Sequence, residues 1–227
     1  MDYVLHKLRL RPGERMLDVG CGWGGLVLRA AQRFGATVLG ITLSARQLEE
    51  ARRRIEEAGV RDRARVELRD YRDLSGERFD KIVSIGMFEH RGRAKLPEYF
   101  RTIYRALRPG GLSLNTGISH QDSRTSGKMT GFIEHFIFPD GELVPISEAL
   151  TISERAGFEV RDVESLREHY MRTTRAWVAN LERNRAAAVA AAGEVTYRLW
   201  RLYLAGSAQG FRTDESEFIK HFWRART

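Results

Sequence analysis

The chain has 227 residues, of which 42% are hydrophobic and 30% are charged, a composition that is typical of a folded soluble protein and excludes wholesale disorder. Its 38 basic and 30 acidic residues leave a formal net charge of +8, for which a biased genome composition and attraction to an anionic surface are alternative explanations. The single cysteine, Cys21, excludes an internal disulfide, and no run of about 18 apolar residues predicts a membrane span. We expect a cytoplasmic protein without a signal peptide.

The first half of the chain alternates apolar strands with amphipathic helices. Strands are expected at residues 15–19, 36–41, 65–68, 79–85 and 112–116. Helices are expected at residues 2–10, 23–34, 44–58 and 96–107. This alternation predicts βαβ units and therefore an α/β fold, with a parallel sheet and helices on both of its faces. Ligands of such sheets bind beyond the carboxyl ends of the strands, so functional residues should follow those ends.

The pattern changes after Ile118. Residues 120–130 are polar and predict a loop, residues 132–138 form an aromatic apolar segment, and residues 168–204 predict one long Arg- and Ala-rich helix. A helix at 146–156 and strands at 158–163 and 217–223 complete the pattern and bring the sheet to seven strands. We expect a single domain, residues 1–227, with lid or substrate-binding elements in about 117–145 and 168–210.

The turn after the first strand carries the first binding signal. The run Asp18-Val-Gly-Cys-Gly-Trp-Gly-Gly25 places glycines between a strand and a helix, where the backbone can approach a ligand closely. It lacks the Lys of a phosphate-binding P-loop, and the second strand ends without the acid that a dinucleotide site needs. An acid before the first glycine suits the amino group of S-adenosylmethionine, which is therefore the predicted cofactor. A tight turn without a ligand is the alternative.

Further motifs follow the other strands, namely Gly40-Ile-Thr-Leu-Ser44 with Gln47, Asp70-Tyr-Arg-Asp-Leu74, Val83-Ser-Ile-Gly-Met-Phe-Glu-His90 and Phe138-Pro-Asp-Gly141. With the glycine loop they resemble the cyclopropane-fatty-acyl-phospholipid synthases, a group that includes the mycolic acid cyclopropane synthases and methyltransferases. The resemblance implies a Rossmann-like class I methyltransferase with a mostly parallel seven-stranded sheet and a C-terminal helical lid. It also implies a segment before the first strand that covers the methyl donor. This chain starts at Met1-Asp-Tyr3, so we expect it to lack that region and to have a cofactor site that is open on one side.

The resemblance implies that S-adenosylmethionine lies across the strand ends. The residues expected to hold it are Asp18, Gly20, Cys21, Gly22, Trp23, Gly24, Thr42, Leu43, Ser44, Gln47, Asp70, Tyr71 and Arg72. The glycines would cradle its methionine and ribose, and Tyr71 would stack on the adenine. Ser44 and Gln47 also form a capping box for the helix at 44–58, and both roles can coexist. For Tyr71 the alternative is ordinary packing at a strand end.

The resemblance also implies the reaction and three catalytic residues. A cis alkene attacks the sulfonium methyl, a carbocation forms, and a bound bicarbonate takes the proton that is then lost. Glu89 and Tyr170 match a Glu and a Tyr that hold bicarbonate in the family, whereas Asn115 stands where the family has a His. Asn donates and accepts hydrogen bonds but cannot be protonated. Either bicarbonate is held more weakly here, or the chemistry differs.

The expected substrate is an unsaturated fatty-acyl chain of a phospholipid, converted to a cyclopropane or to a methylene- or methyl-branched chain. Arginines would draw the protein to the anionic inner face of a membrane. A small-molecule N- or C-methyltransferase and a catalytically weakened S-adenosylmethionine-binding paralogue are the alternatives. Nucleic acid is disfavoured as a partner, because residues 85–88 lack the [DNS]-P-P-[YF] motif of amino-methylating enzymes. Histidines 90, 120, 135 and 169 show no metal-binding spacing, so we expect no metal.

Overall fold

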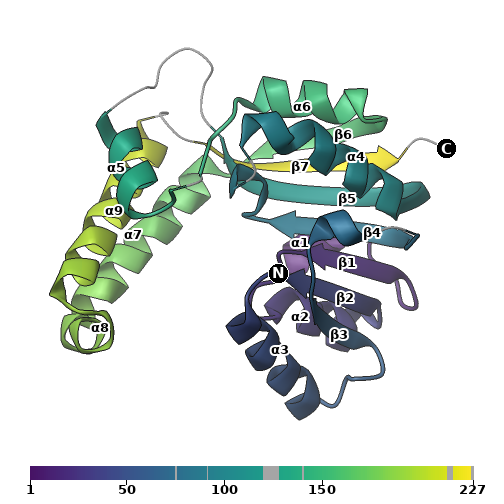
Figure 1. The fold of residues 1–227 in the computed structure, drawn as a ribbon, viewed down its shortest axis with the longest axis horizontal. Helices are drawn as coiled ribbons and strands as arrows, with labels where there is room; N and C mark the ends of the chain where they lie inside the picture. The colour runs from purple at the N-terminus through teal and green to yellow at the C-terminus, as the bar shows by residue number, and fades with distance from the viewer. Residues whose placement is uncertain (75, 91, 120–127, 140, 214–216, 226–227) are drawn as a thin grey trace.

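A seven-stranded sheet in the order β3-β2-β1-β4-β5-β7-β6 forms the centre of the computed structural model, which describes all residues except 75, 91, 120–127, 140, 214–216 and 226–227 (Figure 1). The first five strands in this order are parallel, and β7 runs antiparallel to both β5 and β6. This confirms the mostly parallel, Rossmann-like sheet. The strands are β1 (Arg15–Val19), β2 (Thr37–Thr42), β3 (Ala64–Leu68), β4 (Phe79–Ile85), β5 (Leu107–Ser119), β6 (Phe158–Ser165) and β7 (Glu217–Ala225).

Helices cover both faces of the sheet, as expected. Successive strand residues point to opposite faces, so Met16 belongs to one apolar layer and Leu17 to the other. The layer around Met16 includes side chains of α1 (Asp2–Lys7), α2 (Gly25–Phe34) and α3 (Ala45–Glu57). The layer around Leu17 includes side chains of α4 (Leu96–Ala106) and α6 (Ile146–Arg155). Short 3-10 turns, η1 (Tyr71–Asp73), η2 (Phe88–His90) and η3 (Arg93–Lys95), follow β3 and β4.

The helices α7 (Arg167–Arg183), α8 (Arg185–Ala192) and α9 (Glu194–Arg212) form an arm that projects from one end of the sheet, with α5 (Lys128–Phe136) beside α9 (Figure 1). The prediction of one helix over 168–204 was wrong. The chain turns at Asn184, whose Nδ2 donates to the carbonyl oxygen of Asn180, and again at Gly193. Gly193 has φ of +83°, a backbone conformation that favours glycine and ends α8. The chain therefore folds back on itself here, although helix-forming Ala and Arg surround the turn.

Several predicted boundaries differ from the structure. The first helix ends at Lys7 rather than at residue 10, and β5 extends well beyond 112–116 at both ends. Most of the loop predicted at 120–130 lies outside the described residues, but residues 128–130 belong to α5 and are helical. Across the described part of the chain, no helix has the length and apolar character needed to cross a bilayer.

Candidate active site

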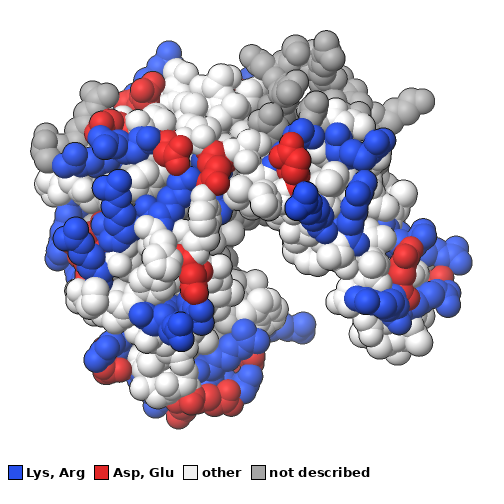
Figure 2. Space-filling model, turned by 180° about the vertical axis from the view of Figure 1, so that it is seen from behind, with Lys and Arg blue, Asp and Glu red and all other residues white. Residues whose placement is uncertain are grey.

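The carboxyl ends of β1, β2, β4 and β5 meet at one edge of the sheet, because these strands are parallel neighbours. The arm stands off from this edge (Figure 1). Figure 2 shows a deep hollow between the arm and the rest of the molecule. Most predicted site residues lie in the segments that directly follow these strands. The fold therefore gathers them at the edge beside the arm.

The glycine loop between β1 and α2 has a backbone that favours glycine. Gly20, Gly22 and Gly24 have φ of +77°, +54° and +77°. The N–H groups of Gly20 and Cys21 each donate to the carbonyl oxygen of Ile41 at 3.0 Å, which ties the loop to β2. No atom of the described residues lies within 4 Å of the position that a Cβ would take on Gly22. The loop therefore presents bare backbone to which a ligand has close access.

Two side chains of this loop point in different directions. Cys21 is buried against Gly40 of β2, where a Cβ would lie 2.9 Å from its sulfur. Burial raises the pKa of the Cys21 thiol to about 12, so this thiol stays protonated. Trp23 is instead 51% exposed. Of these two predicted cofactor residues, only Trp23 therefore offers a side chain at the surface of the loop.

Asp18, near the end of β1, is a buried acid. It is only 3% exposed, and burial raises its pKa to about 7. Among the described residues no ion pair or hydrogen bond of its carboxylate offsets this burial. Burying an unpaired carboxylate is costly, and a cationic group placed against it would favour the charged form. The amino group of S-adenosylmethionine is such a group, so the chemistry of this loop fits the predicted cofactor.

The end of β2 is held by a short hydrogen-bond chain. Ser44 caps α3, because its hydroxyl accepts from the N–H of Gln47 at 3.3 Å. The Gln47 side chain does not complete the capping box; instead its Oε1 accepts from the Thr42 hydroxyl at 2.6 Å. The Ser44 N–H also donates to Thr42 Oγ1, at 3.2 Å. Leu43, between Thr42 and Ser44, is 65% exposed, so an apolar side chain stands at the surface just beyond β2.

The segment after β3 places Asp70 at the N-cap of η1, and Tyr71 and Arg72 within η1. Asp70 accepts from the Arg72 N–H at 2.9 Å, and the two side chains form an ion pair at 2.8 Å. Tyr71 is 4% exposed, and its ring packs edge-on against Tyr99 of α4, 5.5 Å away. This is the packing role that was the alternative for Tyr71. Stacking of its ring on adenine stays a prediction.

Glu89 lies in η2, just beyond β4, and is largely buried. Its Oε1 accepts from the Ile118 N–H at 3.4 Å, whereas its Oε2 has no partner among the described residues. Burial raises the Glu89 pKa to about 7. The carboxylate sits over Gly117 of β5, where a Cβ would lie 2.9 Å from Oε2 and closer still to the Phe88 ring. Only glycine at position 117 leaves room for this arrangement.

The other two predicted catalytic residues lie on different elements, Asn115 on β5 and Tyr170 on α7. Asn115 is buried, and its Oδ1 accepts from the Tyr99 hydroxyl at 3.1 Å. The Tyr170 ring stacks on Phe218 of β7, with centroids 4.0 Å apart. The Tyr170 pKa is raised to about 12, first by burial and then by nearby Tyr203 and Glu89. Tyr170 and Glu89 are therefore close enough for their charges to interact.

Tyr203 of α9 is a residue of this site that the sequence analysis missed. Burial raises its pKa, and the charge of Glu89 raises it further. Its ring meets Phe138 at 5.7 Å and Trp200 at 5.6 Å, both edge-on. No local motif distinguishes Tyr203 within its helix, since only the antiparallel return of α9 along α7 brings it here. Tyrosine and other aromatic rings thus line the side of the site that belongs to the arm.

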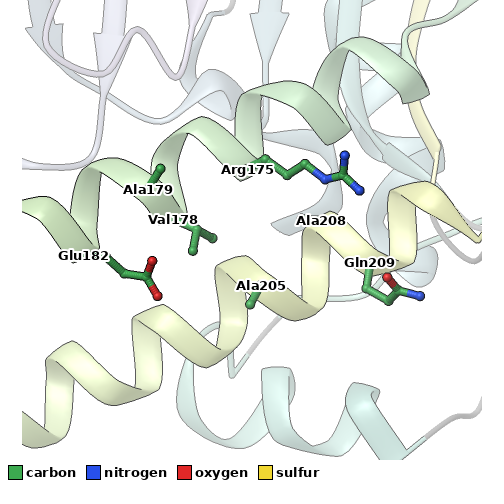
Figure 3. A pocket seen from close by; sticks show the side chains of 7 residues that line it. All are labelled: Arg175, Val178, Ala179, Glu182, Ala205, Ala208 and Gln209. Carbon is green, nitrogen blue, oxygen red and sulfur yellow. The ribbon is translucent and has the colours of Figure 1, made fainter.

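A groove with a cavity volume of about 280 Å³ runs between α7 and α9 (Figure 3). Small residues of both helices, Ala179, Ala205 and Ala208, leave the space open. Arg175 and Glu182 stand at the groove, and Glu182 is paired with Arg201 at 2.7 Å. None of the predicted cofactor or catalytic residues lines it.

Comparison with known proteins identifies relatives across nearly the whole chain. The sequence model of mycolic acid cyclopropane synthetase matches residues 1–221. The chain is 48% identical to the "Probable fatty acid methyltransferase" of Pseudomonas putida over 92% of this chain and 54% of that protein. It is 34% identical to Cyclopropane mycolic acid synthase 1 of Mycobacterium tuberculosis, over 93% of this chain and 77% of that protein.

Solved structures agree with these matches. A mycolic acid cyclopropane synthase complexed with SAH and CTAB has a TM-score of 0.92 and 32% identity, over 98% of this chain and 82% of that one. A phosphoethanolamine N-methyltransferase of Haemonchus contortus, 22% identical with a TM-score of 0.83 over 99% of this chain and 51% of that one, shares the fold alone. The chain spans about half the length of several curated relatives. Because the family match covers almost every residue and relatives exceed 30% identity, the chain belongs to the mycolic acid cyclopropane synthetase family of S-adenosylmethionine-dependent methyltransferases.

Proposed function

We propose that this chain transfers a methyl group from S-adenosylmethionine to the cis double bond of an unsaturated fatty-acyl chain of a phospholipid, giving, with loss of one proton, a cyclopropane, a methylene-branched chain or a methyl-branched chain that keeps a double bond. The observation that carries the proposal is Glu89, a buried carboxylate with an oxygen that has no partner within the described part of the chain, in largely aromatic surroundings. An alkene has no acidic proton, so its methylation needs a base only after the new C–C bond has formed. An acid whose pKa is near 7 suits that delayed step.

Residues at the ends of β1, β2 and β3 would hold the cofactor. When bound, S-adenosylmethionine supplies an electrophilic methyl group. Asp18 would pair with the amino group of the cofactor. The backbone of Gly20 and Gly22 would lie close to the cofactor, because these residues have no side chain. Leu43 and Trp23 would offer exposed apolar surface. These assignments rest on the burial of the Asp18 carboxylate and on the open space at Gly22.

Residues of η2, β5 and the arm would act on the substrate. Glu89 would take the proton that leaves the methylated acyl chain, and Tyr170 with Tyr203 would pack against that chain. Bicarbonate, which the resemblance implies as a base, would meet Glu89, Tyr170 and Asn115. An amide at position 115 can hydrogen-bond such an anion but cannot share its proton, so Glu89 would carry more of the acid–base work here. The arm and α5 would form the lid over the acyl chain.

The surface charge supports contact with an anionic membrane. The net charge is +8, and Figure 2 shows basic side chains on the arm and on the body beside the hollow. Each Lys or Arg near an anionic lipid surface contributes about 1 kcal/mol. Vesicles of phosphatidylglycerol should therefore bind the protein. Salt at 0.5 M should release it, since the Debye length falls to roughly a few ångströms at high salt. Equal binding to neutral phosphatidylcholine vesicles would refute an electrostatic contact.

Methyl transfer is tested with methyl-labelled S-adenosylmethionine and vesicles that contain cis-unsaturated phospholipid. Mass spectrometry should find one added CH₂ per modified acyl chain, and vesicles of saturated lipid should take up no label. Glu89→Gln should abolish transfer while SAH still binds, because the amide fills the same space but cannot accept a full proton. Glu49→Gln, an exposed change on α3, is the matched control. Label in a small amine but in no lipid would refute the lipid substrate.

A further inference from the structure

Three polar side chains form a row across the middle of the sheet, on the face covered by α4. Ser84 of β4 is paired with Asn115 of β5, and Asn115 is paired with His221 of β7, so the three stand side by side on adjacent strands. Each is at most 2% exposed. Trp223, two residues beyond His221, lies on the same face, with ring centroids 5.1 Å apart. This face is otherwise built from apolar and aromatic side chains.

The hydrogen bonds of this row are incomplete among the described residues. Asn115 Oδ1 accepts from the Tyr99 hydroxyl, but the Ser84 hydroxyl, Asn115 Nδ2, both ring nitrogens of His221 and Trp223 Nε1 have no partner. Burial lowers the His221 pKa to about 3, so the imidazole is neutral, with one donor and one acceptor. The N–H donors of Asn115, His221 and Trp223 outnumber the available acceptors. Buried polar groups are nearly always satisfied, so the row needs an acceptor oxygen.

The row adjoins the candidate active site through Phe88. The Phe88 ring lies 6.0 Å from the His221 ring, and it also covers Gly117, over which the Glu89 carboxylate sits. Asn115 and Gly117 are two residues apart on one strand and so face the same side. The Asn115 amide has two N–H bonds, so one can donate to an acceptor within the row while the other points toward the active site. The orientation of the amide therefore depends on which group accepts from the N–H bond that faces the row.

We propose that His221 and Asn115 form one positioning unit, joined by a buried water that accepts from the surplus N–H groups, and that this unit fixes the Asn115 amide at the active site. A water satisfies two to four polar partners in such places, which matches the groups left over. The inference about Asn115 at the reacting end rests on the proposed function, whereas the pairing itself does not. His221 is a positioning residue here, since it acts through Asn115.

The pairing is tested without cofactor or substrate. In ¹⁵N-labelled protein, long-range ¹H–¹⁵N spectra report the protonation of each imidazole, and His221→Gln identifies the His221 signals by their loss. We expect one neutral tautomer between pH 5 and pH 8, and a shift of a ring nitrogen signal in Asn115→Leu. A His221 that titrates near pH 6.5, or ring signals that ignore Asn115→Leu, would overturn the pairing. Failure of methyl transfer leaves this result unaffected.

The positioning role is tested by kinetics on the folded variants. His221→Leu should lower kcat by about tenfold or more while KM and SAH affinity change less than about twofold, and His221→Gln should restore most of the loss. Phe222→Leu perturbs the same strand on its opposite face and should keep wild-type kcat. An unchanged kcat in His221→Leu, or an equal loss in Phe222→Leu, would overturn the role. If His221→Leu does not fold, His221→Ala takes its place: a kcat at least about threefold below that of His221→Gln supports the role, and equal kcat values of the two variants overturn it.

Discussion

Gly117→Ala should show how tightly the active-site floor is packed. The new Cβ would lie 2.9 Å from Glu89 Oε2 and closer still to the Phe88 ring, whereas carbon atoms ordinarily meet at about 3.5–4.0 Å. Phe88 is fully buried, so its ring has little room to retreat. Overpacking of this kind costs about 1–3 kcal/mol. For a chain of this length each kcal/mol lowers Tm by about 2–4 °C, so a fall of about 2–12 °C is expected.

Urea denaturation and a thermal scan of the apo-protein measure this effect. Gly131→Ala is the matched control, because none of the described residues lies within 4 Å of its Cβ position and it stands inside α5. Ala is favoured over Gly in a helix by roughly 0.5–1 kcal/mol, so the control should be neutral or stabilising. Equal denaturation midpoints for Gly117→Ala and wild type would refute the close packing of Phe88 and Glu89 on β5.

The folded pKa values of Asp18 and Glu89, both about 7, exceed the ordinary values of 3.8 and 4.5, because both groups are buried. The free energy of unfolding of the apo-protein should therefore fall as the pH rises from about 4.5 to about 7, by on the order of 1–3 kcal/mol per group. Urea denaturation at pH 5 and pH 7.5 measures this, and Glu89→Gln should flatten the slope. SAH should bind more tightly at pH 8 than at pH 6, since Asp18 must ionise to pair with its amino group; calorimetry on Asp18→Asn should find weak, pH-independent binding. Ser44→Ala removes the cap of α3 and should cost about 1 kcal/mol in the same denaturation assay.

The sequence predicted the sheet and the glycine loop because their signals are local. Periodic apolar strands, the glycines of the loop and the Ser44 cap each act within a few residues, and the structure contains all of them. The division of the arm was missed, since helix-forming Ala and Arg surround the turn at Gly193 and mask it. Local propensity cannot foresee a reversal that packing of α7 on α9 stabilises.

The site was predictable only where a motif carried it. Glu89 and Asn115 stand in recognisable strand-end segments, but Tyr203 and His221 reach the site through pairings between distant parts of the chain. The strand at 217–223 was expected, yet its register against β5 was not. A shift of that register by one residue would turn the His221 side chain to the opposite face of the sheet. Such residues become visible only once the strand order is known.

The position of β7 between β5 and β6 also bears on how the protein is made. Within the described sheet, β6 does not pair with β5 and is joined to the other strands through β7. β7 follows β6 in the chain by about fifty residues, and long-range pairing of this kind slows folding. On the ribosome, β1 to β5 can assemble early, while one edge of β5 stays open until residues 217–225 emerge. During that interval the open edge is a template for wrong pairing, so the interval between synthesis of β5 and of β7 is when the chain is most exposed to misfolding.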